Sequence, residues 1–142
     1  MATSTAEPSI VVERAVTRTV DDTISTSVIA GATVRQDGHV ATTWYLASGP
    51  PESTTEAVIV YNADMADGTV SVSAVGTSGP VPVDELQDLP IEPASFLVID
   101  LTDPLVVDRQ LVIESSTRVF VERSYPTGRS ATRTSSWAVP AG

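Results

Sequence analysis

Three oxygen-bearing side chains stand close together in the tract "NADMADG", where Asn62, Asp64 and Asp67 precede Gly68. Calcium-binding loops also space their oxygen ligands before a glycine. The EF-hand pattern fails here by one residue, and no glutamate follows at the distance that the pattern requires. Asn, Asp and Gly are also the residues that a hairpin turn favours. We therefore predict a turn and no specific metal site, with Asn62, Asp64 and Asp67 as the candidate ligands if a cation binds.

A catalytic Ser/His/Asp triad would depend on the single histidine, His39, which lies in a predicted turn. The tract "GTSGP" does not match the G-x-S-x-G nucleophile elbow, because Gly79 follows Ser78 directly. Eighteen acidic residues allow many carboxylate pairs for glycoside hydrolysis, and nothing in the sequence selects one pair. The sequence has no cysteine for a thiolate metal site and no glycine-rich phosphate loop. We predict a protein that has no catalytic residues and needs no cofactor.

The tripeptide V-E-R occurs twice, with Glu13 and Arg14 in the first copy and Glu122 and Arg123 in the second. Neighbouring side chains of a strand point to opposite faces, so the Glu and Arg of one copy cannot pair with each other. Each charge must find a partner on an adjacent strand, because an unpaired buried charge is costly. We predict structural ion pairs that fix strand register. A binding role is the alternative.

Both tryptophans occur in the same frame, Trp44 in "TTWYLASG" and Trp137 in "SSWAVPAG". On a strand, Trp44 and Tyr45 point to opposite faces, so one of them belongs to the core. We assign structural roles to Trp44 and Trp137. Exposed aromatic side chains are common in sugar- and protein-binding surfaces, so Tyr45 is the candidate binding residue. The alternative is that both aromatic residues are packed.

The elements that would position these residues are short strands, since Val and Thr dominate the chain and ten prolines and eight glycines interrupt it. The one helix candidate is a single turn in "VDELQDL", residues 83–89. The pattern predicts an all-β protein, an immunoglobulin-like antiparallel β-sandwich of about 8–10 short strands. The predicted strands are 9–20, 23–34, 40–47, 56–63, 69–76, 94–101, 105–115, 117–125 and 131–139.

The repeated tracts follow the order V-E-R, Trp, body, V-E-R, Trp. One full body, residues 44–136, lies between the tryptophans, and its size is close to the ~100 residues of an immunoglobulin-like sandwich. Residues 9–43 repeat only the closing strands of such a unit. We predict that 9–142 form one domain, with these strands packed on the full unit, after a disordered lead at 1–8. Addition of the strands to a neighbouring copy is the alternative.

The motifs resemble those of a repeat-domain family of unknown function in actinobacterial cell-envelope and secreted proteins. Units of that family open with W-Y-[FL]-A-x-G, continue with a strand ending in Asn and a Pro–small–Ser segment, and close with V-x-E-R. The matching tracts here are "WYLASG", "VIVYN", "EPASFLVIDL" and "RVFVERSY". The resemblance covers about residues 42–125, with a shorter match at 10–20; Ser48 stands where the family often has Glu. It implies a non-catalytic extracellular β module and names no substrate.

The formal net charge of −10 argues against nucleic acids and anionic membranes as partners, because their negatively charged phosphates would be repelled. No apolar run approaches the ~20 residues of a membrane span. The tract "MATSTAEPS" lacks the regions of a signal peptide, so the expected extracellular or cell-envelope location follows from the family resemblance. We predict a structural or adhesion module that contacts a protein or a cell-wall component and could self-associate weakly through edge strands. The alternative is a small binding module for a cell-wall glycan or a cation.

Overall fold

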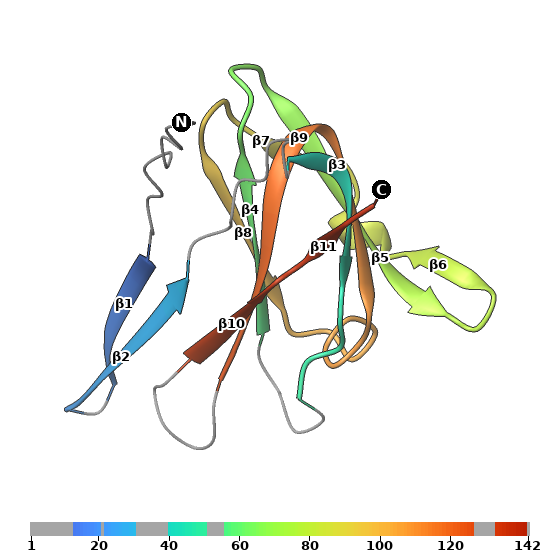
Figure 1. Cartoon of the computed structure of the whole chain (residues 1–142). Helices are drawn as coiled ribbons and strands as arrows, with labels where there is room; N and C mark the ends of the chain where they lie inside the picture. Colours follow the sequence, from blue (N-terminus) through green and yellow to red (C-terminus); the bar gives the residue numbers. More distant parts are fainter. Residues whose placement is uncertain (1–12, 21, 31–39, 51–55, 127–132, 142) are drawn as a thin grey trace, which may run out of the picture.

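A computed structural model of the chain describes residues 13–20, 22–30, 40–50, 56–126 and 133–141. These residues form β-strands and one short 3-10 helix, η1 (Asp84–Leu86), within the stretch predicted to hold a helical turn (Figure 1). In this part of the chain, no helix has the length and hydropathy needed to cross a bilayer. The strands are β1 (Glu13–Val20), β2 (Thr23–Ala30), β3 (Ala41–Leu46), β4 (Glu56–Asn62), β5 (Gly68–Gly76), β6 (Gly79–Pro82), β7 (Leu89–Ile91), β8 (Phe96–Leu101), β9 (Leu111–Pro126), β10 (Arg133–Trp137) and β11 (Val139–Pro140).

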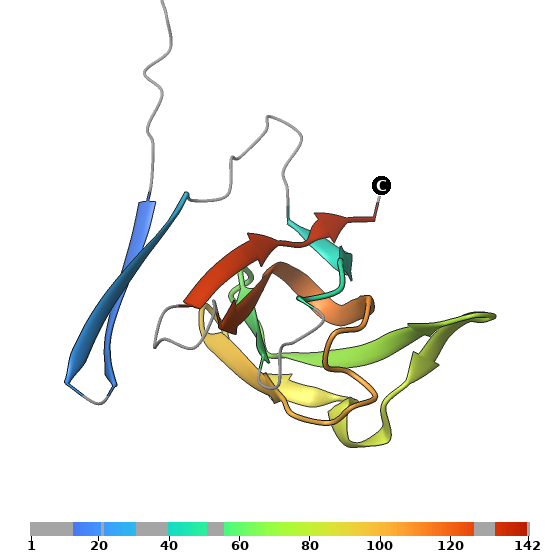
Figure 2. The same cartoon turned by 90° about the horizontal axis from the view of Figure 1, so that it is seen from below.

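Nine of these strands form one antiparallel sheet that folds over on itself into two layers (Figure 2). Its main path runs β11-β3-β9-β4-β8, with β10 also paired to β9 and with β5 paired to β9, β6 and β7. This architecture confirms the predicted all-β antiparallel sandwich. The finer prediction of an immunoglobulin-like strand arrangement stays a prediction.

The long strand β9 joins the two layers. Its first half, from Leu111, pairs with β3 and β5, and its second half, from Val119, pairs with β4 and β10. Between the halves the register against β3 shifts, and the backbone N–H of Thr117 donates to the Ser115 hydroxyl at 3.2 Å. Such a bulge bends a strand so that it can leave one layer and enter the next.

The prediction of two separate strands at 105–115 and 117–125 was therefore wrong. The first predicted strand begins in a turn, in which Asp103 accepts hydrogen bonds from the backbone of Leu105, Val106 and Val107. The turn ends near Asp108, whose φ of 54° lies in the left-handed region. The predicted boundary between residues 115 and 117 is instead the bulge of β9.

The Pro-rich segment at 77–93 contains two strands that the sequence did not predict, β6 and β7. Among the described residues both pair with β5 alone, and such end strands tolerate proline because one row of their backbone groups needs no partner. Gln87 fixes the connection, since its side-chain amide donates to the carbonyls of Val72 at 2.7 Å and Val83 at 3.0 Å.

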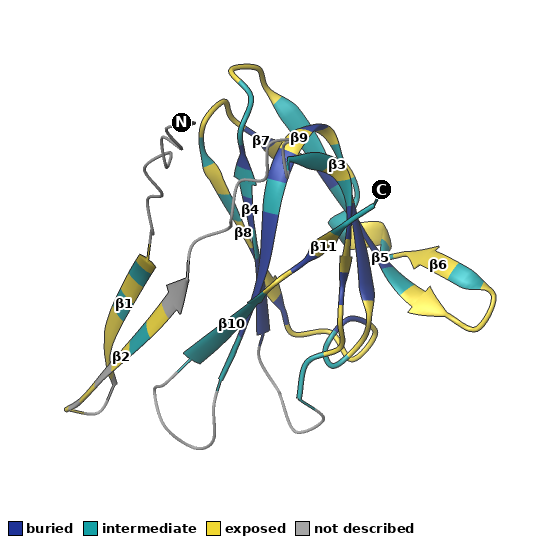
Figure 3. Cartoon of the chain, viewed as in Figure 1, coloured by how far each residue is buried: buried dark blue, intermediate teal, exposed yellow. Residues whose placement is uncertain are grey.

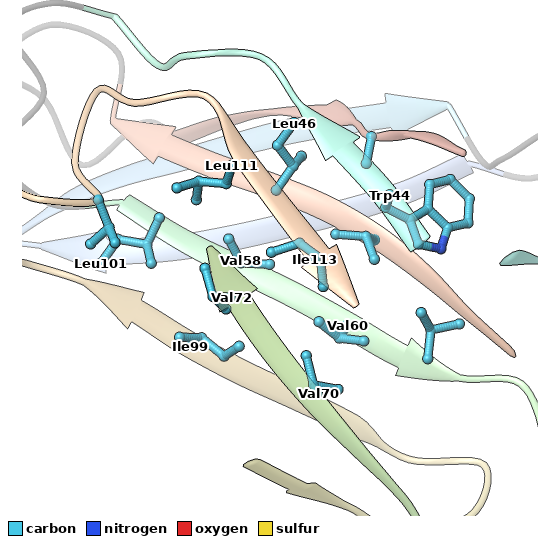
Figure 4. Close-up of a cluster of buried hydrophobic side chains, with 14 of the residues drawn as sticks. Trp44, Leu46, Val58, Val60, Val70, Val72, Ile99, Leu101, Leu111 and Ile113 are labelled. Atoms are coloured by element: carbon cyan, nitrogen blue, oxygen red, sulfur yellow. The ribbon is translucent and has the colours of Figure 1, made fainter. Parts of the chain in front are cut away.

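The core lies between the two layers and consists mainly of β-branched and Leu side chains that alternate along the strands (Figure 4). This period of two follows from strand geometry, in which every second side chain faces the same layer. The labelled members of the cluster are Trp44, Leu46, Val58, Val60, Val70, Val72, Ile99, Leu101, Leu111 and Ile113.

Strands β1 and β2 form a separate two-stranded hairpin beside the sandwich (Figures 1 and 2). Its register runs from Glu13 opposite Ala30 to Val20 opposite Thr23, and Asp22 in the turn has a φ of 62°. Within the described residues each of the two strands pairs only with the other, while β2 lies next to β10. The predicted lead at 1–8 lies outside the described residues, and the proposed division into repeat units stays a prediction.

Candidate functional site

The second V-E-R copy holds a fully buried arginine on the core side of β9. The Nε of Arg123 donates to Glu56 Oε2 at 2.8 Å, and Nη2 donates to the same oxygen. Its Nη1 donates to the carbonyls of Ala47 and Arg109, each at 2.6 Å, and Nη2 also reaches the carbonyl of Val106 at 3.4 Å. Glu56 lies on β4, the strand adjacent to β9. The guanidinium thus ties the ends of two loops to the interior of the sandwich.

The opening motif "WYLASG" meets this ion pair through its last residue. A Cβ atom at Gly49 would lie 1.8 Å from Glu56 Oε1, so only glycine leaves room for the carboxylate. That oxygen is buried and has no hydrogen-bond partner among the described residues. Because the carbonyl of Ala47 also accepts a hydrogen bond from Arg123, the two motifs of the family resemblance converge on one buried pair. Trp44 and Leu46 of the first motif and Val121 and Arg123 of the second are buried in the sandwich.

The first V-E-R copy makes contact with the second. Arg14 Nη2 donates to Glu122 Oε1, which joins the hairpin to the outer face of β9. Glu122 is 2% exposed, whereas Glu13 lies exposed on the other face of the hairpin. The expectation of a partner on an adjacent strand was wrong for Arg14, because Ile29 stands opposite it on β2. The carboxylate comes from the neighbouring sheet instead.

The two tryptophans occupy different environments although their tracts pair with each other. Trp44 is buried in the core, and its indole Nε1 donates to the carbonyl of Ala41 at 3.1 Å. Trp137 lies on β10 opposite Glu122 and is 40% exposed. The next residues of the second tract form β11, which pairs with β3 at Trp44 and Tyr45. The repeated frame therefore closes the sandwich at this edge.

Two of the three candidate metal ligands, Asn62 and Asp64, hold a turn. The side-chain amide of Asn62 donates to the carbonyls of Ala66 at 2.8 Å and Glu92 at 3.0 Å, and its oxygen accepts the backbone N–H of Asp64. The Asp64 carboxylate accepts the backbone N–H of Arg118 at 2.9 Å and two guanidinium bonds from the same residue. These bonds hold the pKa of Asp64 below its ordinary value. Asp67 is exposed, and no cluster of three potential ligands occurs within the described ranges.

The candidate binding residue Tyr45 is half-exposed on the outer face of β3. It stands opposite Val139 of β11 and Val112 of β9, and Val139 is exposed. Two residues along the strands, a polar row crosses the same face. That row consists of Thr43, Glu114 and Ser71.

A second apolar surface, which sequence reasoning missed, lies on the outer face of β8 and β4, and Figure 3 colours positions along β8 as exposed. Phe96 and Val98 of β8 are 65% and 58% exposed. The ring of Tyr61 lies 4.8 Å from that of Phe96 and 6.4 Å from that of Phe120 on β9. We call Phe96, Val98, Tyr61 and Phe120 the β8 surface. Strand β8 ends the main strand order, so one of its edges has no paired strand among the described residues, and the face that carries Phe96 and Val98 is exposed.

Two other residues bear on the sequence predictions. Glu56 was not singled out, and its only signal was an acidic residue at the start of an apolar run. His39 lies outside the described residues.

No family model matches this chain, and a search of curated proteins finds no match. The chain is similar to a solved structure titled "Crystal Structure of Thermotoga maritima 1070". The two share 17% identity at a TM-score of 0.56, over 72% of this chain and 97% of that one. This similarity shows a shared fold and carries no function.

Proposed function

We propose that this chain is a non-catalytic structural and protein-interaction module of a larger cell-surface protein. The proposal is supported by where the motif residues lie. Arg123, Trp44 and Gly49 serve the interior, and Asn62 and Asp64 serve a turn, so none of them presents a reactive group to a ligand. The extracellular location follows from the family resemblance.

The β8 surface is the contact that we propose for a neighbouring protein. Its two most exposed side chains, Phe96 and Val98, lie on the end strand of the sheet. An end strand offers unpaired backbone groups, and apolar side chains on alternate positions add area to a strand that pairs with it. The resemblance implies tandem units, so a second copy of this chain represents the neighbouring unit.

Concentration-dependent NMR spectra of the purified chain test this proposal. Weak association should shift the amide signals of β8 and β4 as the concentration rises, and Val98→Lys should abolish the shifts. Val81→Lys is the matched control, because Val81 is 56% exposed on β6. Shifts centred on another region, or none up to millimolar concentration, would contradict the proposed contact.

The second candidate function is binding of a cell-wall glycan at Tyr45. It is favoured by the half-exposed aromatic ring beside the polar row of Thr43, Glu114 and Ser71. Sugar rings stack on such side chains while neighbouring polar groups orient them. Titration with soluble peptidoglycan fragments should then shift the NMR amide signals around Tyr45 and leave those of the β8 surface unchanged. Loss of binding in Tyr45→Ala would support this function over the first.

A further inference from the structure

A small cavity lies between the β1–β2 hairpin and the outer face of the sandwich. Its volume is about 90 Å³, and Val16 and Ile59 form its apolar walls. The polar lining comes from four strands, with arginine and serine side chains only: Arg14, Arg18, Ser27, Ser124, Arg133 and Ser135. Three of the eight cationic residues of a chain with net charge −10 therefore line a single cavity.

The strand registers explain this convergence. Arg14, Val16 and Arg18 alternate along β1 and so share the face that looks toward the sandwich, with Ser27 opposite Val16. On the sandwich side, Ser135 of β10 stands opposite Ser124 of β9. The cationic lining is thus fixed by backbone pairing on both sides.

The positive charge in the cavity is only partly neutralised. Arg14 is paired with Glu122, but within the described residues neither Arg18 nor Arg133 forms an ion pair. Arg133 instead donates Nε to the Ser124 hydroxyl at 3.0 Å and Nη2 to the Ser124 carbonyl at 2.8 Å.

The electrostatics of Arg133 agree with this arrangement. Burial lowers the pKa of its guanidinium, and the positive charge of Arg18 lowers it further. Asp100 and Glu56 oppose the shift, but each acts less strongly than Arg18. Two like charges are therefore held near each other in a partly desolvated space, which is unfavourable until an anion joins them.

We propose that this cavity binds one small oxyanion group, a carboxylate or a phosphate- or sulfate-type group, between Arg18 and Arg133. Guanidinium groups donate pairs of parallel hydrogen bonds to such oxygens, and serine hydroxyls donate to the oxygens that remain. The volume of about 90 Å³ accommodates a single group of this size. Because Arg18 belongs to the hairpin and Arg133 to the sandwich, the anion also strengthens the docking of the hairpin.

Titration of the full chain with inorganic phosphate, and separately with acetate, tests the proposal, with sodium chloride at matched ionic strength as the reference. At least one oxyanion should produce saturable NMR shifts at the amides of Ser27 and Ser135, and chloride should not. The oxyanion that saturates identifies the source chemistry, phosphate-type or carboxylate. Arg18→Gln, at an exposed position, should weaken the binding by about tenfold or more.

Arg109→Gln is the matched control, because it removes the same charge from an exposed position that lies outside the cavity. Binding that survives Arg18→Gln as well as it survives Arg109→Gln would overturn the proposal. The absence of saturable shifts for both oxyanions in the unmodified chain would overturn it independently of any variant.

Discussion

The two V-E-R copies carry the same side chains into opposite environments. Arg123 in the sandwich is fully buried, with Glu56 and three backbone carbonyls as acceptors. The side chain of Arg14 in the hairpin is 41% exposed and, within the part of the chain that the structure describes, reaches one carboxylate, that of Glu122. The same tripeptide therefore anchors the interior in one copy and docks a peripheral hairpin in the other. The contribution of an arginine to stability therefore depends on the number of its hydrogen-bond acceptors and on how much water its burial displaces.

Breaking the interior anchor should have the largest effect. Arg123→Ala leaves the buried carboxylate of Glu56 without its partner, and loss of one member of a buried pair costs about 3–5 kcal/mol. Urea unfolding of the variant measures this loss. Arg118→Ala is the control, because it removes an arginine from an exposed pair with Asp64. A change under about 0.5 kcal/mol for Arg123→Ala would place the residue at the surface instead.

Crowding the same anchor should have the next largest effect. Gly49→Ala places a methyl group 1.8 Å from Glu56 Oε1 and must displace the ion pair. We expect a loss of about 3 kcal/mol, the upper end of the range for an overpacked interior. Gly76→Ala is the control in the same assay, since its Cβ would lie 3.2 Å from a Val81 methyl group at an exposed site. Equal losses of stability for the two substitutions would show that the Glu56 side chain can move aside at no cost in unfolding free energy.

Breaking the peripheral anchor should cost less. Arg14→Gln removes the charged partner of Glu122, whose buried carboxylate then lacks its ion pair, at about 1–2 kcal/mol. The loss should appear in thermal unfolding of the full chain. Glu13→Gln, on the exposed face of the same strand, should leave stability unchanged. If both variants behave alike, the hairpin does not depend on the Arg14–Glu122 contact.

The smallest effect concerns the pair outside both anchors, Asp64 and Arg118, and it depends on pH. The hydrogen bonds from Arg118 lower the pKa of Asp64 below its ordinary value of 3.8, so the folded chain binds this proton less readily than the unfolded chain. The stabilisation is therefore present above pH 3.8 and disappears as the pH falls through the lowered folded value. The stability difference between the unmodified chain and Arg118→Gln should shrink on acidification. A difference that grows on acidification would contradict this assignment.

The sequence predicted the strand content well because alternation and turn residues act locally. It predicted that Arg123 needs a carboxylate, but the choice of Glu56 depends on the β4–β9 register, which only the assembled sheet defines. The contact between Arg14 and Glu122 was also not predicted, because it joins two sheets and follows no periodic pattern along the sequence. The β8 surface was missed for the same reason, because the exposure of an apolar strand face depends on what packs over that face in the assembled sandwich.

Native-state hydrogen exchange tests most directly whether the two copies anchor separate regions. The hydrogen-bonded backbone amides of β1 and β2 should exchange through local opening of the hairpin. The amides of β4 and β9 should exchange through global unfolding, which has a higher free energy. Arg14→Gln should lower the protection of the hairpin further and leave that of β4 and β9 almost unchanged. Equal protection in both regions, reduced together by Arg14→Gln, would contradict the account.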